Sequence, residues 1–314
     1  MTTTESRAAQ HETARPDASE RADAAFLEVA GLEVHLPTGP RKEIQAVQSV
    51  SLRVHRGERV GIVGESGSGK SVTGRAIAGL LPTNPRVRVA GSIRFDGREM
   101  VGAPARAWDE IRSRSVGMIF QDPLTFLNPV MKVGAQVREA ITPDERSGRD
   151  AAADPEAIRY LKLAGLADAD DLARRFPHEL SGGQRQRVLI AIAIAKRPDL
   201  IIADEPTTAL DATVQRRVLN TLDETVTTLG TSLILISHDL AVVASMTDTI
   251  YVMYAGRVVE SGPTRQVLTS PQHLYTQALL RSVRSLTDDG VDLWSITPEL
   301  RREIDAIVKD GANA

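Results

Sequence analysis

The sequence contains no cysteine, so no disulfide bond and no cysteine-ligated metal or iron–sulfur cluster can form. It also has no apolar run close to the ~20 residues that a membrane-spanning helix requires, and its longest such run is the short stretch Val188–Ala195. The first residues lack the apolar core of a secretory signal. Any role at a membrane must therefore depend on a partner protein.

The chain also lacks a large excess of either charge. Its 38 basic and 41 acidic residues leave a formal charge of −3, which argues against broad nucleic-acid binding because such binding needs a basic surface. Apolar residues make up 42% of the 314 residues, which is enough to form a core. This length is typical of one large domain or two smaller ones.

Alternating apolar and polar residues predict strands over 26–34 and 46–54, with a turn at Pro37–Pro40 between them. Ile93 and Phe95 show the same alternation before an Asp-Gly turn. We expect these segments to form an antiparallel sheet. Residues 1–24 before them have almost nothing to bury, so we expect a disordered tail.

Short apolar runs later in the chain predict buried strands at Leu200–Ala203 and Thr231–Ile236, and a hairpin at 250–260. We expect a parallel sheet packed beside the antiparallel one. The last fifty residues begin with a helical pattern at Leu274–Leu280 and then become polar. We expect poor order from Asp288 onward.

The segment between these strands, from Gln121 to about Ala195, has a helical character. Val133, Val137 and Ile141 recur at helical spacing, and Ile158, Leu161 and Leu166 predict a second amphipathic helix. The polar stretch 143–154 between the two is expected to be a loop.

The stretch Gly64–Ser71 reads Gly-Glu-Ser-Gly-Ser-Gly-Lys-Ser and matches the phosphate-loop pattern G-x-x-x-x-G-K-[ST]. A β-prone run precedes it, and residues 72–81 predict a helix that stops at Pro82. Glycines let the backbone wrap closely round a phosphate, and N–H groups at the start of the helix bind the anion. Lys70 can reach the β and γ phosphates, and the Ser71 hydroxyl can ligate Mg²⁺. A merely flexible Gly/Ser loop would not need strand, lysine, serine and helix in this order.

Two carboxylates, Asp204 and Glu205, follow the apolar run at 200–203. Ligands bind at the carboxyl ends of strands in α/β sheets. Asp204 can hold Mg²⁺ through water, opposite Ser71, while Glu205 is free to orient and polarise an attacking water. An ordinary strand that ends in a charged turn is the alternative, and the phosphate loop in the same chain argues against it.

The pentapeptide Leu180-Ser-Gly-Gly-Gln184 precedes a helix predicted over Arg185–Lys196. A serine and two glycines at a helix start can bind an anion. On local chemistry alone, the simpler interpretation is that Ser181 caps the helix.

Taken together, these motifs resemble those of the ABC ATPase family. The pentapeptide at 180–184 is similar to the family's signature, and Gln121 in Phe-Gln-Asp-Pro is similar to its Q-loop. Ala209-Leu-Asp211 resembles the D-loop, and His238 resembles the switch histidine, a contact of the γ-phosphate. The motifs follow the family's order, and the match spans about 26–260.

The resemblance implies a RecA-like P-loop NTPase α/β core with an antiparallel β subdomain and an α-helical subdomain. The implied domains are an ABC ATPase domain over 25–262, with its helical subdomain at about 122–195, and a C-terminal extension over 263–314. It further implies ATP hydrolysis with ATP and Mg²⁺ bound in a head-to-tail dimer with a second, identical or homologous, ATPase subunit. Each ATP would then lie between one phosphate loop and the partner's signature. The resemblance also implies two transmembrane permease subunits as partners, which the segment after Gln121 would contact, and places the ATPase at the cytoplasmic face of the membrane. A solute-binding protein would be an indirect partner.

The residue roles that the resemblance implies fall into three groups. The implied catalytic residues are Glu205, His238, Gln121 and Lys70. The implied metal-site residues are Ser71, Gln121 and Asp204. The implied nucleotide contacts are Leu36, Ala46, Gly64, Glu65, Ser66, Gly67, Ser68, Gly69, Lys70, Ser71, Val72, Ser181, Gly182, Gly183 and Gln184.

A narrower resemblance is to the peptide/nickel importer branch, through the phosphate loop, Leu127-Asn-Pro129, Met253–Arg257 and Ser270–Thr276. The chain departs from this branch in lacking its cysteine motif. It also has Leu36 where the family usually stacks an aromatic residue on adenine, unless another residue near Arg41–Ala46 covers the base.

Three alternatives remain open. A soluble ABC protein acting on ribosomes usually has two nucleotide domains, and a chromosome-maintenance ATPase needs long coiled coils; this sequence has one phosphate loop and no sustained heptads. A degenerate regulatory subunit is the better rival, although the intact Glu205, His238 and signature argue against it.

Overall fold

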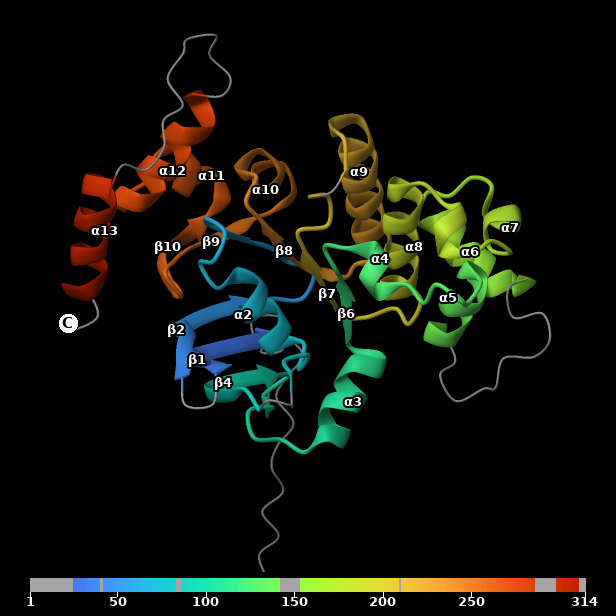
Figure 1. Cartoon of the computed structure of the whole chain (residues 1–314), viewed down its shortest axis with the longest axis horizontal. Coiled ribbons are helices and arrows are strands. Elements are labelled where there is room, and N and C mark those ends of the chain that lie inside the picture. The colour runs from blue at the N-terminus through green and yellow to red at the C-terminus, as the bar shows by residue number, and fades with distance from the viewer. Residues whose placement is uncertain are drawn as a thin grey trace, which may run out of the picture.

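A computed structural model describes residues 25–39, 42–82, 86–141, 153–208, 210–285 and 298–310. The tail expected over 1–24 and most of the loop expected over 143–154 lie outside these described residues. Figure 1 shows the whole chain.

The strands, in chain order, are β1 (Leu27–Gly39), β2 (Lys42–Val54), β3 (Arg59–Val63), β4 (Arg88–Phe95), β5 (Arg98–Glu99), β6 (Val116–Ile119), β7 (Leu200–Asp204), β8 (Ser232–Ser237), β9 (Thr249–Tyr254) and β10 (Arg257–Pro263). The helices are α2 (Lys70–Ile77), α3 (Ala105–Arg114), α4 (Pro123–Phe126), α5 (Val133–Ile141), α6 (Pro155–Leu163), α7 (Ala169–Leu172), α8 (Gly182–Ile194), α9 (Ala212–Leu229), α10 (Leu240–Met246), α11 (Thr264–Thr269), α12 (Leu274–Ser285) and α13 (Pro298–Asp310).

The strands form two sheets, as the sequence predicted. An antiparallel sheet has the order β2-β1-β4-β5, and a larger sheet has the order β10-β9-β3-β8-β7-β6. In the larger sheet, β6, β7, β8, β3 and β9 run parallel, and β10 pairs antiparallel with β9 at one edge. Helices α5 to α8 gather on the far side of β6 and β7 from the antiparallel sheet (Figure 1). The chain therefore has the expected α/β core, β subdomain and helical subdomain.

Successive residues of the central strands enter different cores, because side chains along a strand alternate between its faces. Val63 and Ile201 lie in the core shared with α8, α9 and α10. Their neighbours Ile62 and Ile202 lie in the core shared with the antiparallel sheet and α2. Burial on both faces explains why β7 is apolar until its last residue.

Aspartates fix where several helices begin. The side chain of Asp154 accepts from the N–H groups of the first turn of α6, and Asp211 and Asp239 do the same for α9 and α10. Each such N-cap contributes about 1 kcal/mol to stability. The helix starts of α9 and α10 are thereby fixed beside the carboxyl ends of β7 and β8.

The turn expected at Pro37–Pro40 begins later than predicted, because β1 continues to Gly39 and Pro37 pairs with Glu43 of β2. The pairing of β1 with β4 ends at His35, so Pro37 has only one neighbouring strand. A proline is tolerated at such an edge position because no second ladder needs its N–H.

Two helices end earlier than predicted, each before a glycine in the left-handed region. Helix α2 stops at Ile77 instead of reaching residue 81, and Gly79 follows with φ of 63°. Helix α6 stops before Leu166, and Gly165 has φ of 74°. Glycine adopts this conformation without the strain that a Cβ adds.

The poor order expected from Asp288 onward is wrong for α13. Ile304 of this helix is fully buried, and Leu300 and Val308 pack partly buried against the same core. These three residues recur at i, i+4 and i+8, which is a helix signal that the polar composition of the segment hides. Among the described residues, no helix combines the length and apolar character needed to cross a membrane.

Candidate active site

The phosphate loop connects β3 to α2 and packs tightly against other strands. Gly64, Gly67 and Gly69 have φ of 151°, 81° and 98°. A Cβ on Gly64 would lie 2.1 Å from the carbonyl oxygen of Met253, and one on Gly69 would lie 2.5 Å from that of Ala46. Gly64 and Gly69 are therefore required both by conformation and by the close approach of β9 and β2, whereas Gly67 is required by conformation alone.

Lys70 points back into the loop from the first turn of α2. Its Nζ donates hydrogen bonds of 2.8 Å to the carbonyl oxygens of Gly64 and Glu65, and the residue is 4% exposed. Desolvation lowers the pKa of Lys70, while the nearby carboxylates of Glu205, Asp204 and Glu65 oppose that shift. The ammonium is thus held inside the loop, where a phosphate would meet it.

Asp204 and Ser71 meet across the end of β7. Ser71 Oγ donates to Asp204 Oδ1 over 2.7 Å. Asp204 Oδ2 is buried without a hydrogen-bond partner and lies 3.6 Å from Arg75 Nη2. Burial raises the pKa of Asp204, although the Ser71 hydrogen bond and the Arg75 charge lower it in part. A buried carboxylate oxygen without a donor is a position that a cation would satisfy.

Mg²⁺ suits this donor set because it takes few protein ligands and keeps water molecules and phosphate oxygens around it. No group of three or more His, Cys, Asp or Glu residues that could hold a metal occurs within the part of the chain that the structure describes. The site could therefore supply one hydroxyl and one carboxylate, and a nucleotide would have to complete the coordination.

Glu205 is the meeting point of the other predicted residues. Its Oε2 accepts hydrogen bonds from Gln121 Nε2 at 3.1 Å and Thr208 Oγ1 at 2.8 Å, and lies 3.4 Å from His238 Nδ1. All three contacts are to one oxygen of the carboxylate. The structure thus brings together Gln121 from the end of β6, Glu205 from β7 and His238 from β8.

The backbone of Glu205 is also unusual. Its φ is 47°, in the left-handed region, and its N–H donates to the carbonyl oxygen of Ile236 over 2.9 Å. A non-glycine residue in this region costs on the order of 1–3 kcal/mol, and such residues concentrate at active sites. The strain directs the side chain toward Gln121 and His238 instead of along the strand.

Thr208 was missed by the sequence analysis. Its hydroxyl holds the Glu205 carboxylate three residues earlier, within the turn that follows β7. Threonine and serine often bond to residues close by in the chain, so the Glu-Pro-Thr-Thr sequence offered a weak signal for such a contact.

Ser181 caps α8, as local chemistry predicted. Gln184 N–H donates to Ser181 Oγ at 3.3 Å, and Ser181 N–H donates to Gln184 Oε1 at 2.8 Å. The helix consequently begins at Gly182, three residues before the predicted Arg185. A Cβ on Gly183 would lie 2.3 Å from Val214 Cγ1, so this glycine also permits close packing on α9.

Helices α8 and α2 lie on opposite sides of β6 and β7 (Figure 1). The signature residues and the phosphate loop therefore occupy separate places in one chain.

The predicted adenine-side contacts, Leu36 and Ala46, lie on β1 and β2. Leu36 is partly buried against the core that the antiparallel sheet shares with α2. Its partner across the β1–β2 hairpin is Ile44, which is 53% exposed. Ala46 lies beside the phosphate loop, since its carbonyl oxygen approaches Gly69. Leu36 as a base contact stays a prediction.

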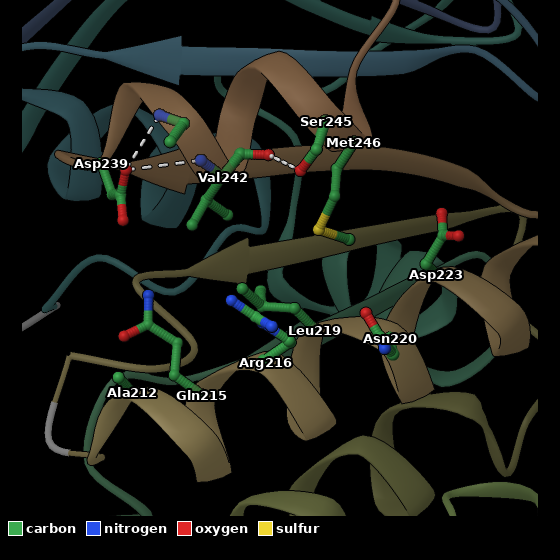
Figure 2. A pocket seen from close by; sticks show the side chains of 11 residues that line it. Ala212, Gln215, Arg216, Leu219, Asn220, Asp223, Asp239, Val242, Ser245 and Met246 are labelled. Atoms are coloured by element: carbon green, nitrogen blue, oxygen red, sulfur yellow. Dashed lines mark hydrogen bonds between the residues drawn. The ribbon is translucent and has the colours of Figure 1, made fainter.

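A separate groove of about 490 Å³ lies between α9 and α10 (Figure 2). Asp239 and Ala212 line it at the starts of these helices, and Met246 lies farther along α10. No sequence-predicted site residue lines this groove. The phosphate loop, Glu205 and His238 lie elsewhere, at the carboxyl ends of β3, β7 and β8.

Comparison with known proteins decides the family. The sequence model described as "ABC transporter" matches residues 47–208, about half of the chain. The chain belongs to the ABC transporter family.

Curated relatives extend this match over most of the ABC protein. The oligopeptide transport ATP-binding protein OppD of Bacillus subtilis is 43% identical over 87% of the chain and 76% of the relative. The dipeptide transport ATP-binding protein DppD of Haemophilus influenzae is 46% identical over 87% and 82%. The resemblance to the peptide importer branch is thereby confirmed.

Solved ABC structures share the fold. The ATP-binding cassette MJ0796, solved as a dimer in a post-hydrolysis state with ADP and Pi, aligns with a TM-score of 0.66 and 29% identity over 76% of this chain and 99% of that one. CbiO1 of Clostridium perfringens aligns with a TM-score of 0.64 and 26% identity over 84% and 98%. The predicted fold class and the ATPase activity expected from the motifs are both confirmed: the chain is an ATP-binding, ATP-hydrolysing ABC subunit.

Proposed function

We propose that this subunit energises an ABC importer for peptides, on the cytoplasmic face of the membrane. The observation that carries this proposal is the identity of 43% to 46% with oligopeptide and dipeptide transport ATP-binding proteins along 87% of the chain. Because 273 aligned residues exceed the 262 that precede the C-terminal extension, the relationship includes at least part of that extension as well as the nucleotide core. It favours a peptide substrate over the other solutes that ABC proteins carry.

In the proposed mechanism, the phosphate loop and Lys70 hold the β and γ phosphates of ATP. Phosphoryl transfer to water needs mainly positioning and charge stabilisation. Glu205 orients and polarises the attacking water through its carboxylate. Gln121 and His238, which already contact Glu205 Oε2, then bind that water or the γ-phosphate. The contacts of Gln121 and His238 with Glu205 support these assignments.

Ser71 and Asp204 would hold Mg²⁺, with Gln121 nearby. The ion, when bound with ATP, supplies positive charge to the β and γ phosphates. The support in this chain is the buried Asp204 Oδ2, which accepts no hydrogen bond, beside the Ser71 hydroxyl.

A second ATPase subunit is required in this proposal, since α8 and α2 lie on opposite sides of β6 and β7 (Figure 1). The partner's Ser181, Gly182, Gly183 and Gln184 would then contact the ATP held by this chain's phosphate loop. The capped N-terminus of α8 offers backbone N–H groups suited to an anion.

Two permease subunits are the proposed membrane partners. Exposed apolar side chains follow Gln121 in and beyond α4: Leu124 is 60% exposed, Phe126 45% and Val130 80%. Phe126 also stacks on Phe120, next to Gln121, with ring centroids 3.6 Å apart. A contact made at this surface could therefore change the position of Gln121.

The test is coupling of hydrolysis to peptide. The tagged full chain would be co-purified with its membrane subunits, identified by mass spectrometry, and reconstituted in lipid with the solute-binding protein of the same system. We expect ATP hydrolysis to rise when a mixture of short peptides is added, and a matched mixture of free amino acids to have no effect. Co-purification without polytopic membrane proteins, or hydrolysis that responds to no peptide, would contradict the proposal.

A further inference from the structure

The C-terminal extension reaches the phosphate loop. Tyr275, at the start of α12, is fully buried, and its hydroxyl oxygen accepts a hydrogen bond of 2.9 Å from the Glu65 N–H. Burial raises the pKa of the Tyr275 hydroxyl, so this group stays neutral. One loop N–H is therefore held by a residue more than two hundred positions away in the chain.

The carbonyl oxygen and the carboxylate of Glu65 also have partners. Its carbonyl oxygen accepts from Lys70 Nζ over 2.8 Å, and its carboxylate lies 3.0 Å from Arg301 Nη2 on α13. A single loop residue thus links the phosphate-binding lysine to both α12 and α13.

Contacts that do not involve Glu65 fix the position of α13. Tyr254 donates from its hydroxyl to Asp305 Oδ1 over 2.7 Å, and its ring packs on Tyr275 with centroids 4.6 Å apart. Ile304 is buried in the core that α8, α9 and α10 share. Arg301 is therefore presented to Glu65 by a docked helix.

We propose that Tyr275 and Arg301 are positioning residues of the nucleotide site, which act on bound phosphates through Glu65. Tyr275 fixes the loop backbone next to the carbonyl that Lys70 contacts. Arg301 offsets the Glu65 carboxylate, an anion that would otherwise repel the phosphates. ATP affinity then depends on the docking of α13, and by reciprocity bound ATP favours that docking.

This inference rests on the proposed role of the phosphate loop, and the two can fail separately. The full chain is titrated with Mg-ATP by calorimetry. Binding by the unaltered chain that is lost in Lys70→Ala supports the loop's role before any residue of the extension is changed.

The first test removes the Tyr275 hydroxyl while keeping its ring. Loss of one hydrogen bond in Tyr275→Phe should weaken ATP binding about 3- to 10-fold. Tyr251→Phe is the matched control, because the hydroxyl of Tyr251 on β9 also accepts one hydrogen bond from a backbone N–H, that of Arg53 on β2, at 3.1 Å. Both variants should lower the thermal unfolding midpoint, and only Tyr275→Phe should weaken ATP binding. Unchanged affinity in Tyr275→Phe, or an equal loss in Tyr251→Phe, would overturn the proposal.

The second test concerns charge. Arg301→Gln should weaken ATP binding about 2- to 5-fold at low salt, and less at high salt, because the pair is half exposed and screened. Arg301→Lys should keep most of the affinity. Arg53→Gln is the matched control, because Arg53 pairs with Glu28 at 3.0 Å on the surface of the β subdomain.

A double-mutant cycle tests whether Arg301 acts through Glu65. In a Glu65→Gln background the repelling charge is gone, so Arg301→Gln should have no further effect on the dissociation constant. An equal loss of affinity in both backgrounds would show that Arg301 does not act through Glu65, and would overturn this assignment.

Discussion

Single residues at the ends of β7 and β8 set the expected chemistry, and Glu205 is the most direct to test. Glu205→Gln keeps the shape and the contacts of the side chain but is neutral, so it cannot polarise water as the carboxylate does. We expect ATP binding to stay within about twofold and hydrolysis to fall about 10²- to 10⁴-fold, the usual contribution of a general base. Calorimetry and phosphate release from the assembled transporter would measure the two effects.

The control for this change is Glu110→Gln on α3. It removes an exposed carboxylate that pairs with Arg98 and is far from Glu205 in the sequence. Hydrolysis close to that of the unaltered protein in Glu205→Gln would refute the role given to Glu205.

The adenine contact is a second prediction at this scale. Leu36 and Ile44 pair across the hairpin, and Ile44 lies two residues before Ala46, whose carbonyl oxygen approaches the phosphate loop. An aromatic ring stacked on a base contributes ~1–3 kcal/mol, so Leu36→Tyr should tighten ATP binding by about 5- to 150-fold at most. Because phosphate contacts dominate affinity, GTP should bind almost as well as ATP to the unaltered protein.

Ile44→Tyr is the companion variant, since residues 41–46 are the alternative cover for the base. Tighter binding in Ile44→Tyr alone would assign the base to β2. Equal ATP affinity in both variants and the unaltered chain would remove this hairpin face from the adenine site.

Residues whose roles depend on local sequence could be predicted, and those that depend on distant packing could not. Lys70 begins the helix after the phosphate loop, and Asp204 and Glu205 lie where β7 ends, so the chemistry expected of them follows from pattern alone. Tyr275 and Arg301 reach Glu65 only because α12 and α13 fold back over the loop. No spacing in the sequence encodes that approach.

At the scale of elements, the N-terminus of α8 combines two roles that one substitution can separate. Ser181→Asp keeps a side-chain cap, whereas Ser181→Ala removes it at about 1 kcal/mol. Aspartate would also place a negative charge where we expect the γ-phosphate of the ATP that the partner subunit holds. We therefore predict that Ser181→Asp keeps the thermal unfolding midpoint but loses hydrolysis, while Ser181→Ala lowers the midpoint. Full hydrolysis by Ser181→Asp would leave Ser181 as a cap alone.

The β4–β5 turn should make stability depend on pH through Glu99. Partial desolvation would raise the pKa of Glu99, but hydrogen bonds from Ser92 and from the N–H groups of Val101, Ile93 and Met100 lower it to about 2. Because the folded-state pKa is depressed from 4.5, this contribution is present above pH 4.5 and is lost as the pH falls toward 2.

Urea unfolding of Glu99→Gln would test this. The variant should be less stable than the unaltered chain at pH 7, and the difference should shrink between pH 4.5 and 2. A difference that does not change with pH would assign the loss to packing instead of to ionisation.

Elements were predictable where one periodicity dominates, as at Val133–Ile141, which forms α5 with those bounds. Prediction failed where tertiary pairing decides the boundary. Pro37 stays in β1 because only one strand borders it. Helix α13 was missed because its stripe of Leu300, Ile304 and Val308 lies within a polar segment, and its burial depends on a core built elsewhere.

At the scale of the whole molecule, the order of the strands explains why the motifs converge. Strand β3 lies between β9 and β8, and β7 lies next to β8. Their carboxyl ends therefore place the phosphate loop, Glu205 and His238 along one edge of the sheet. The sequence predicted two neighbouring sheets but not this order, which depends on long crossovers between strands far apart in the chain.

The same arrangement leaves α8 on the other side of β6 and β7 from α2 (Figure 1), and the site that we propose is therefore completed by a second chain. Complementation between two defective chains would test this. Lys70→Ala disables a chain's phosphate loop but leaves its signature intact, and Ser181→Asp does the reverse. Each variant alone should form dimers without any intact site. An equal mixture should recover hydrolysis up to about a quarter of the unaltered level, because about half of the dimers are mixed and each mixed dimer has one intact site of two. A mixture no more active than either variant alone would contradict a site shared between two copies of this chain.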